Sequence, residues 1–72
     1  MSKEIVSPVA GSVWKVECAE NDSVTEGQVL FIIESMKMEI PIEAEHAGVV
    51  HKILVKEGEP VEEEQVVCHI KG

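Results

Sequence analysis

The sequence predicts an all-β domain, a flattened barrel or sandwich of short strands made from two related halves. Hydrophobic residues make up 44% of the chain and are mainly valine and isoleucine, which favour strands. No stretch keeps a helical period over three turns, and the chain repeats itself with an offset of 37 residues. The 72 residues are enough for a single domain, 1–72, with one small core.

The repeat aligns the two halves without a gap, and we place its units at about 5–36 and 40–72. The matched residues are Ile5 with Ile42, Ala10-Gly11 with Ala47-Gly48, Val13 with Val50, Lys15 with Lys52, Val24 with Val61, Gln28-Val29 with Gln65-Val66 and Ile33 with Ile70. A single pair of units favours two halves that face each other across a pseudo-twofold axis. Lys37 has no counterpart, because the offset carries it beyond Gly72. We therefore expect Lys37 and the chain termini at opposite ends of the molecule.

The first unit predicts three strands separated by turns that contain glycine or polar residues. The expected strands cover residues 5–9, 13–18 and 28–34. Pro8 cannot donate a hydrogen bond to a sheet, so it favours an edge strand or a strand end. Residues 28–34 are almost all apolar, which is typical of a strand buried on both faces or crossing between sheets.

The second unit predicts the same order of elements. Its expected strands cover residues 39–44, 50–55 and 66–70. In the first of these, Glu39, Pro41 and Glu43 alternate with apolar residues, which indicates one outward and one inward face. Pro41 again places this strand at an edge. The acidic segment 57–64 is expected to be a solvated loop.

Charge and cysteine content exclude several classes of function. The formal net charge of −8 argues against a nucleic-acid partner, since little positive charge is present to neutralise phosphates. No apolar run approaches the roughly 20 residues of a membrane span, and no secretory signal is seen, so we expect a soluble, cytoplasmic protein. Cys18 and Cys68 occupy apolar positions, which favours buried thiols over a disulfide.

The histidines and the single tryptophan are weaker candidates for function. His46, His51 and His69 lack metal-ligand spacing, so no metal site is predicted and surface positions are expected. Trp14 is the counterpart of His51, next to a glycine bend. We expect it to cover one end of the core, with a partner contact as the alternative.

The centre of the chain carries Glu34-Ser35-Met36-Lys37-Met38. With Pro8-Val9-Ala10-Gly11 upstream and Ile42-Glu43-Ala44 and Ala47-Gly48-Val49-Val50 downstream, this motif resembles the biotinyl/lipoyl attachment domains from about Ile5 to Ile70. The resemblance implies a barrel-sandwich hybrid of two four-stranded antiparallel sheets with quasi-twofold symmetry. It also implies that Lys37 lies on a hairpin tip and is covalently modified.

The same resemblance implies a function as a carrier. Met36 and Met38 match the biotin signature, so Lys37 is expected to be biotinylated by a biotin protein ligase that also contacts Glu34 and Ser35. The attached group would shuttle as carboxybiotin between a biotin carboxylase and a carboxyltransferase. The domain itself is then expected to be a monomer and not an enzyme, because no nucleophile, base and oxyanion device can be assembled from its motifs.

Two alternatives remain open at this point. Ser35 is similar to the residue that follows glutamate in lipoyl acceptors, where Asp-Lys-Ala replaces Met-Lys-Met. Lys37 would then accept lipoate from a lipoate ligase, or accept both groups. In the third interpretation the chain is an unmodified binding module, because a lysine at a hairpin tip is usually a solubilising charge and nearby methionines are usually part of the core.

Overall fold

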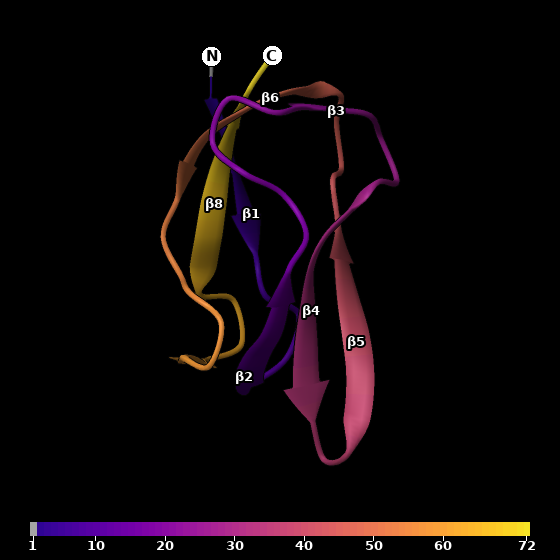
Figure 1. The fold of residues 1–72 in the computed structure, drawn as a ribbon, viewed down its shortest axis with the longest axis vertical. Helices are drawn as coiled ribbons and strands as arrows, with labels where there is room; N and C mark the ends of the chain where they lie inside the picture. The colour runs from indigo at the N-terminus through magenta and orange to yellow at the C-terminus, as the bar shows by residue number, and fades with distance from the viewer. Residues whose placement is uncertain (1) are drawn as a thin grey trace.

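The computed structural model describes residues 2–72, which form eight strands in two sheets (Figure 1). The strands are β1 (Ser2–Val6), β2 (Gly11–Val16), β3 (Ser23–Val24), β4 (Val29–Ser35), β5 (Met38–Glu43), β6 (Gly48–Ile53), β7 (Pro60–Val61) and β8 (Val66–Lys71). The part of the chain described here contains no helix long and apolar enough to cross a membrane. The predicted all-β class is therefore confirmed.

Each sheet has four antiparallel strands, and the two sheets are built alike. We call the one with the order β1-β8-β6-β3 the first sheet and the one with the order β5-β4-β2-β7 the second sheet. Shifting the strands of the second sheet by 37 residues, β4 and β2 forwards and β5 and β7 backwards, gives the strands of the first sheet in the same order. The predicted pair of four-stranded sheets with quasi-twofold symmetry is confirmed.

Backbone hydrogen bonds between the halves occur in equivalent pairs that are related by the same 37-residue offset. The Val13 N–H donates to the Glu59 carbonyl at 2.8 Å, and the equivalent Val50 N–H donates to the Asp22 carbonyl at 2.8 Å. Each half therefore pairs its second long strand with a loop of the other half. Because these bonds are reciprocal, neither half can satisfy its backbone without its partner.

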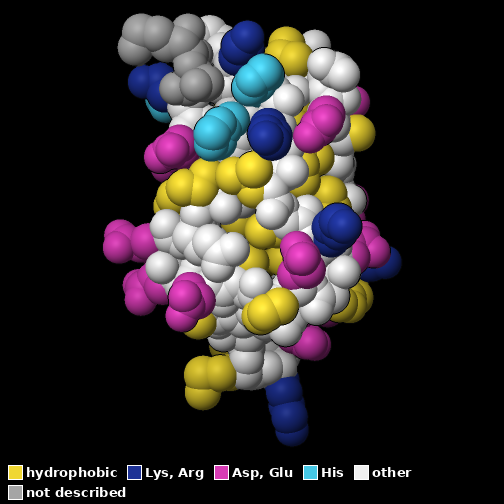
Figure 2. Space-filling model, turned by 90° about the vertical axis from the view of Figure 1, so that its left-hand side faces the viewer, with side chains coloured by type: hydrophobic (Ala, Val, Ile, Leu, Met, Phe, Trp, Pro, Cys, Tyr) yellow, Lys and Arg dark blue, Asp and Glu magenta, His cyan; other side chains and the backbone are white. Residues whose placement is uncertain are grey.

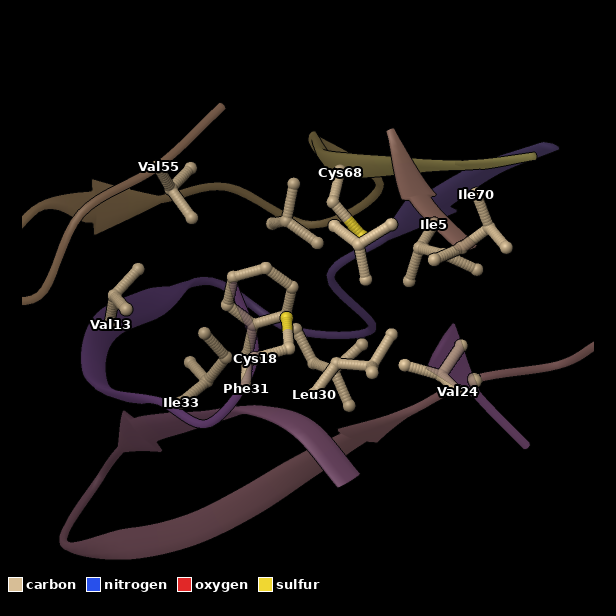
Figure 3. Close-up of a cluster of buried hydrophobic side chains, with 14 of the residues drawn as sticks. Ile5, Val13, Cys18, Val24, Leu30, Phe31, Ile33, Val55, Cys68 and Ile70 are labelled. Carbon is tan, nitrogen blue, oxygen red and sulfur yellow. The ribbon is translucent and has the colours of Figure 1, made fainter. Parts of the chain in front are cut away.

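The core lies between the two sheets and is almost wholly apolar (Figure 3). Its fully buried side chains include Val13, Leu30, Phe31, Ile33, Val50, Val67, Cys68 and Ile70. Cys18 and Cys68 are both buried and both free, as predicted. Ser7 is the buried polar exception, and its hydroxyl donates to the Val9 carbonyl at 2.7 Å.

Three local predictions need correction. β1 spans Ser2–Val6 instead of 5–9, because β8 supplies pairing partners for its polar first residues and the chain turns away before Pro8. The strands β3 and β7 were not predicted, since each has only two residues and forms through contacts with the other half. Trp14 does not cover the core, because it lies at a bulge in β2 with 43% of its surface exposed.

The hairpin that joins β4 to β5 lies at one end of the molecule, and the chain ends lie at the other (Figure 1). At that second end, Ser2 pairs with Lys71 and the Gly72 backbone approaches Ala47. The domain measures 33 Å along its long axis against 18 and 17 Å across it. The hairpin tip is thus as far from the termini as this small fold allows.

Candidate functional site

Lys37 lies at the apex of a two-residue β-turn. Ser35 pairs with Met38 across β4 and β5, which leaves Met36 and Lys37 as the only residues of the turn. Their φ angles are 52° and 65°, both in the left-handed region. This is the pattern of a type I′ turn, whose twist matches that of the flanking strands. The lysine is therefore presented by a tight connection and not by a loose loop.

The turn is made from residues that do not suit it. Asparagine, aspartate and glycine are the residues that adopt the left-handed region readily at these positions, whereas other L-residues lose about 1 kcal/mol or more there. Met36 and Lys37 both belong to the disfavoured kind. Since local backbone preference argues against them, their side chains must be retained for another reason.

The methionines around Lys37 face solvent. Met36 is 91% exposed and Met38 is 62% exposed, and Lys37 is also exposed. In the space-filling view this end of the molecule is narrow, and a basic side chain extends beyond it (Figure 2). The methionines are therefore not part of the core, contrary to what the interpretation as an unmodified binding module expects of them.

The hairpin rests on strands that cannot easily move. β4 lies between β5 and β2, and its residues Phe31 and Ile33 are fully buried. At Gly11 a side-chain carbon would lie only 2.4 Å from the Glu34 carbonyl oxygen, so glycine allows β2 to approach the base of the hairpin. A rigid base presents the apex in one orientation, which lowers the ordering cost of docking to another protein.

Glu34 and Ser35, the other predicted site residues, lie on the last two positions of β4. Ser35 is half-buried opposite Met38, and Glu34 is exposed opposite Glu39. Sequence reasoning missed Glu39 as a member of this site. The signal was available, because a two-residue turn at Met36 and Lys37 pairs Glu34 with Glu39. Two like charges placed directly opposite each other destabilise a hairpin unless a cation lies between them.

Other chemically active groups do not gather near the hairpin. His46 and His51 are exposed and His69 is half-buried, and among residues 2–72 no group of three metal-ligating side chains is close enough to hold an ion. Burial, and to a lesser degree Cys18, raises the pKa of the Cys68 thiol to about 12. Burial and then Asp22 raise the pKa of Cys18. Both thiols therefore stay protonated and unreactive.

A groove of about 220 Å³ opens between the edge strands β1 and β5. It is lined by Ile5, Val6, Pro8, Pro41, Ile42, Glu43 and Glu45. The lining residues all lie away from the tip, so the groove does not enclose Lys37. A group joined to the Lys37 amine would extend into solvent, which suits a mobile arm.

The chain matches proteins that carry a covalent prosthetic group. Residues 1–70 match the biotin/lipoyl family, described as "Biotin-requiring enzyme". The chain is 44% identical to the biotin/lipoyl attachment protein of Bacillus subtilis over 64 residues, 89% of this chain and 88% of that one. It is 36% identical to a homologue of biotinylated protein TB7.3 from Mycobacterium leprae over 70 residues, 97% of this chain and 99% of that one.

The fold also matches part of a solved enzyme. Kluyveromyces lactis urea carboxylase superposes with a TM-score of 0.93 and 37% identity, over 99% of this chain. The match spans only 6% of the length of that enzyme, so the chain is similar to one small portion of it. With a family match over nearly its whole length and relatives of the same size, the chain belongs to the biotin/lipoyl attachment family.

Proposed function

We propose that the domain is a carrier that holds biotin as an amide on the Lys37 Nζ atom. The observation that carries this proposal is the strained two-residue turn, which displays Lys37 between two exposed methionines on a rigid hairpin. Met36 and Lys37 are not residues that favour this turn, and the methionines bury little surface, so we assign their value to contact with another protein. The domain is a substrate and a carrier, and we assign it no catalytic residue.

Attachment needs one acyl transfer to the amine. The Nζ lone pair attacks the carbonyl carbon of a biotinyl-adenylate supplied by a biotin protein ligase, and the C–N amide bond forms as the C–O bond to AMP breaks. The nitrogen releases its extra proton to a base of the ligase. Met36 and Met38 offer flexible apolar contacts to the ligase, and Glu34 and Ser35 flank them on the same hairpin.

The exposed apex fits a group that must travel between two enzymes. Bound biotin would accept a carboxyl group at a biotin carboxylase and give it up at a carboxyltransferase. The chain contributes reach and position: the tip is narrow, and the groove between β1 and β5 does not enclose it. A monomer in the cytoplasm is consistent with two free, buried thiols and a strongly negative surface.

Lipoate is the second candidate for Lys37. Ser35 favours it, because a serine or threonine after glutamate is typical of lipoyl acceptors. The Bacillus subtilis relative is itself named a biotin/lipoyl attachment protein. Met36 and Met38 favour biotin, so we rank lipoate below it.

Intact mass of the protein isolated from its own cell tests the proposal. Biotin and lipoate add different masses, and an unmodified binding module adds none. We expect the biotin increment, and we expect Lys37→Arg to abolish it while Lys52→Arg, the matched control on β6, keeps it. An adduct that persists in Lys37→Arg would refute the assignment.

The choice between the two groups can be tested on the same hairpin. Replacing Met36 with Asp and Met38 with Ala should slow biotinylation roughly 30-fold, because exposed anchor residues carry about 2 kcal/mol of a protein contact. The same variant should gain acceptance by a lipoate ligase. Initial rates of adduct formation by intact mass measure both effects. Equal biotinylation rates for the variant and the natural sequence would show that the methionines do not direct the choice.

A further inference from the structure

The sulfur atoms of this chain lie in two places that differ in exposure. Within the part of the chain that the structure describes, sulfur occurs in Cys18, Met36, Met38 and Cys68. The two cysteines are buried among the hydrophobic side chains between the sheets (Figure 3). Met36 is 91% exposed and Met38 is 62% exposed. The exposed sulfur described here is therefore confined to the two residues that flank Lys37.

The buried thiols are poor targets for an oxidant. Thiols react with peroxides in their thiolate form, and burial raises the pKa of Cys18 and raises the pKa of Cys68 to about 12. Both thiols therefore stay protonated near neutral pH, and the core shields them from solvent. A thioether has no proton to lose, so methionine oxidation depends on access to the sulfur atom. An oxidant in solution will therefore meet the methionines of the hairpin before the cysteines of the core.

Oxidation at the hairpin changes a contact surface and leaves the core alone. A sulfoxide converts the flexible apolar side chain of methionine into a polar, chiral one, which disrupts apolar interfaces. Met36 lies in the turn and Met38 is the first residue of β5, and the buried cluster is made of other residues. The added oxygen stays hydrated in the free domain. In a contact with another protein it would have to lose that water, which costs free energy unless a hydrogen bond replaces it.

We propose that Met36 and Met38 form a reversible oxidation site for hydroperoxides, and that their oxidation blocks the loading of Lys37. The inference rests on the proposed function. A ligase that acylates the Lys37 Nζ must close around the apex of the turn, so it encloses the side chains on both sides of the lysine. Sulfoxides would place polar oxygen where the natural domain offers apolar surface. A domain oxidised before biotinylation would then lack its prosthetic group until the sulfoxides are reduced.

The chemistry balances in both directions. A lone pair of the methionine sulfur attacks one oxygen of the hydroperoxide, so that an S–O bond forms as the O–O bond breaks. The sulfur loses two electrons to the peroxide. The proton of the transferred oxygen passes to the leaving oxygen, which departs as water or an alcohol. In the reverse direction, methionine sulfoxide reductases oxidise two thiols to a disulfide while the sulfoxide oxygen leaves as water.

The test uses the domain before biotinylation, because biotin contains a thioether of its own. The domain is treated with hydrogen peroxide, the peroxide is removed, and peptide mapping assigns the added oxygens. We expect oxidation of Met36 and Met38, faster at the more exposed Met36, while Cys18 and Cys68 stay reduced. The initial rate of biotinylation by a biotin protein ligase should fall about tenfold or more. Reductases specific for the two sulfoxide epimers should together restore it.

The matched control is the double variant Met36→Leu with Met38→Leu. It keeps apolar side chains on the hairpin and removes both thioethers, and it retains Met1, Cys18 and Cys68. Whatever the rate at which this variant is biotinylated, that rate should be the same before and after peroxide. In the natural domain, the midpoint of thermal unfolding should also stay the same after peroxide, since the oxidised side chains lie outside the core.

The outcomes separate this inference from the proposed function. Methionines that resist peroxide under conditions that oxidise free methionine, or sulfoxides that leave the biotinylation rate unchanged, would overturn the inference and leave the carrier function intact. A loss of rate that persists in the double variant would assign the effect to another residue and would also overturn it. A lower unfolding midpoint in the oxidised domain would do the same by assigning the effect to the fold. An untreated domain that no biotin protein ligase modifies would overturn the inference together with the proposed function.

Discussion

The strands β4 and β5 occupy the same place in the second sheet as β8 and β1 occupy in the first. One pair continues through the Met36-Lys37 turn, whereas the other pair consists of the two ends of the chain. The backbone hydrogen bonds are equivalent, but the side chains at the two ends differ in charge and exposure. The strand pairing that stabilises the fold therefore occurs twice, whereas the turn that carries the attachment lysine occurs once.

The largest expected effect comes from the core, where the two halves differ in side-chain size. Phe31 and Cys68 are equivalent and both fully buried. Phe31→Ala should lower the free energy of unfolding by about 3–5 kcal/mol, because it removes a large side chain and leaves a cavity. Cys68→Ala should lower it by less, since fewer atoms are lost. Urea unfolding measures the free energy of unfolding of both variants. Equal losses would show that side-chain size does not determine how much each half contributes to the core.

The glycines at the start of β2 and β6 give a stricter test of equivalence. A side-chain carbon at Gly11 would lie 2.4 Å from the Glu34 carbonyl oxygen, and one at Gly48 would lie 2.4 Å from that of Lys71. Gly11→Ala and Gly48→Ala should each lower the free energy of unfolding by about 2 kcal/mol, because backbone must shift. Only Gly11→Ala should also slow biotinylation, since only it displaces the hairpin. Equal biotinylation rates in both variants would show that a change at Gly11 does not affect how the hairpin presents Lys37.

The turn residues with positive φ should give a smaller effect of opposite sign. Met36 and Glu64 both adopt the left-handed region without being glycine, and Gly27 is the equivalent of Glu64 in the other half. Met36→Gly and Glu64→Gly should each raise the free energy of unfolding by about 1 kcal/mol. Thermal unfolding measures this gain. Biotinylation should slow only in Met36→Gly, and a similar slowing in Glu64→Gly would show that the effect is not local.

The buried thiols predict a pH dependence that begins only in alkali. The pKa of Cys68 is raised from 9.0 to about 12 in the folded domain, so above pH 9 the unfolded chain loses this proton and the folded domain keeps it. Stability should therefore be unaffected by Cys68 below pH 9 and fall as the pH rises from 9 to 12. Urea unfolding against pH measures the slope, and Cys68→Val should flatten it. An unchanged slope in the variant would assign it to other groups.

Much of this fold was accessible from the sequence because the repeat is long and gapless. Alternation along 39–44 predicted an edge strand with Pro41 facing outward, and β5 is such a strand. The two-residue strands β3 and β7 could not be predicted from the sequence. They form only where a loop of one half meets a strand of the other, and no local pattern reports such a contact.

The attachment motif could be predicted from the sequence, but the residues that lie beside one another on the folded surface could not. The residues from Glu34 to Met38 are contiguous, so the sequence could place them together on a turn. Trp14 was expected over the core, because a large aromatic side chain usually lies inside and the β2 bulge that turns it outward leaves no mark in the sequence. Its neighbours Ile32 and Pro41 join it only through strand pairing.

We propose that one amine of this chain, the Lys37 Nζ, is displayed for acylation by another protein. Peptide mapping by mass spectrometry, applied to protein purified from its own cell, tests it most directly. We predict biotin on the peptide that contains Lys37, with the peptides that contain Lys15, Lys52 and Lys71 unmodified. An unmodified Lys37, or a prosthetic group on a different lysine, would contradict the account.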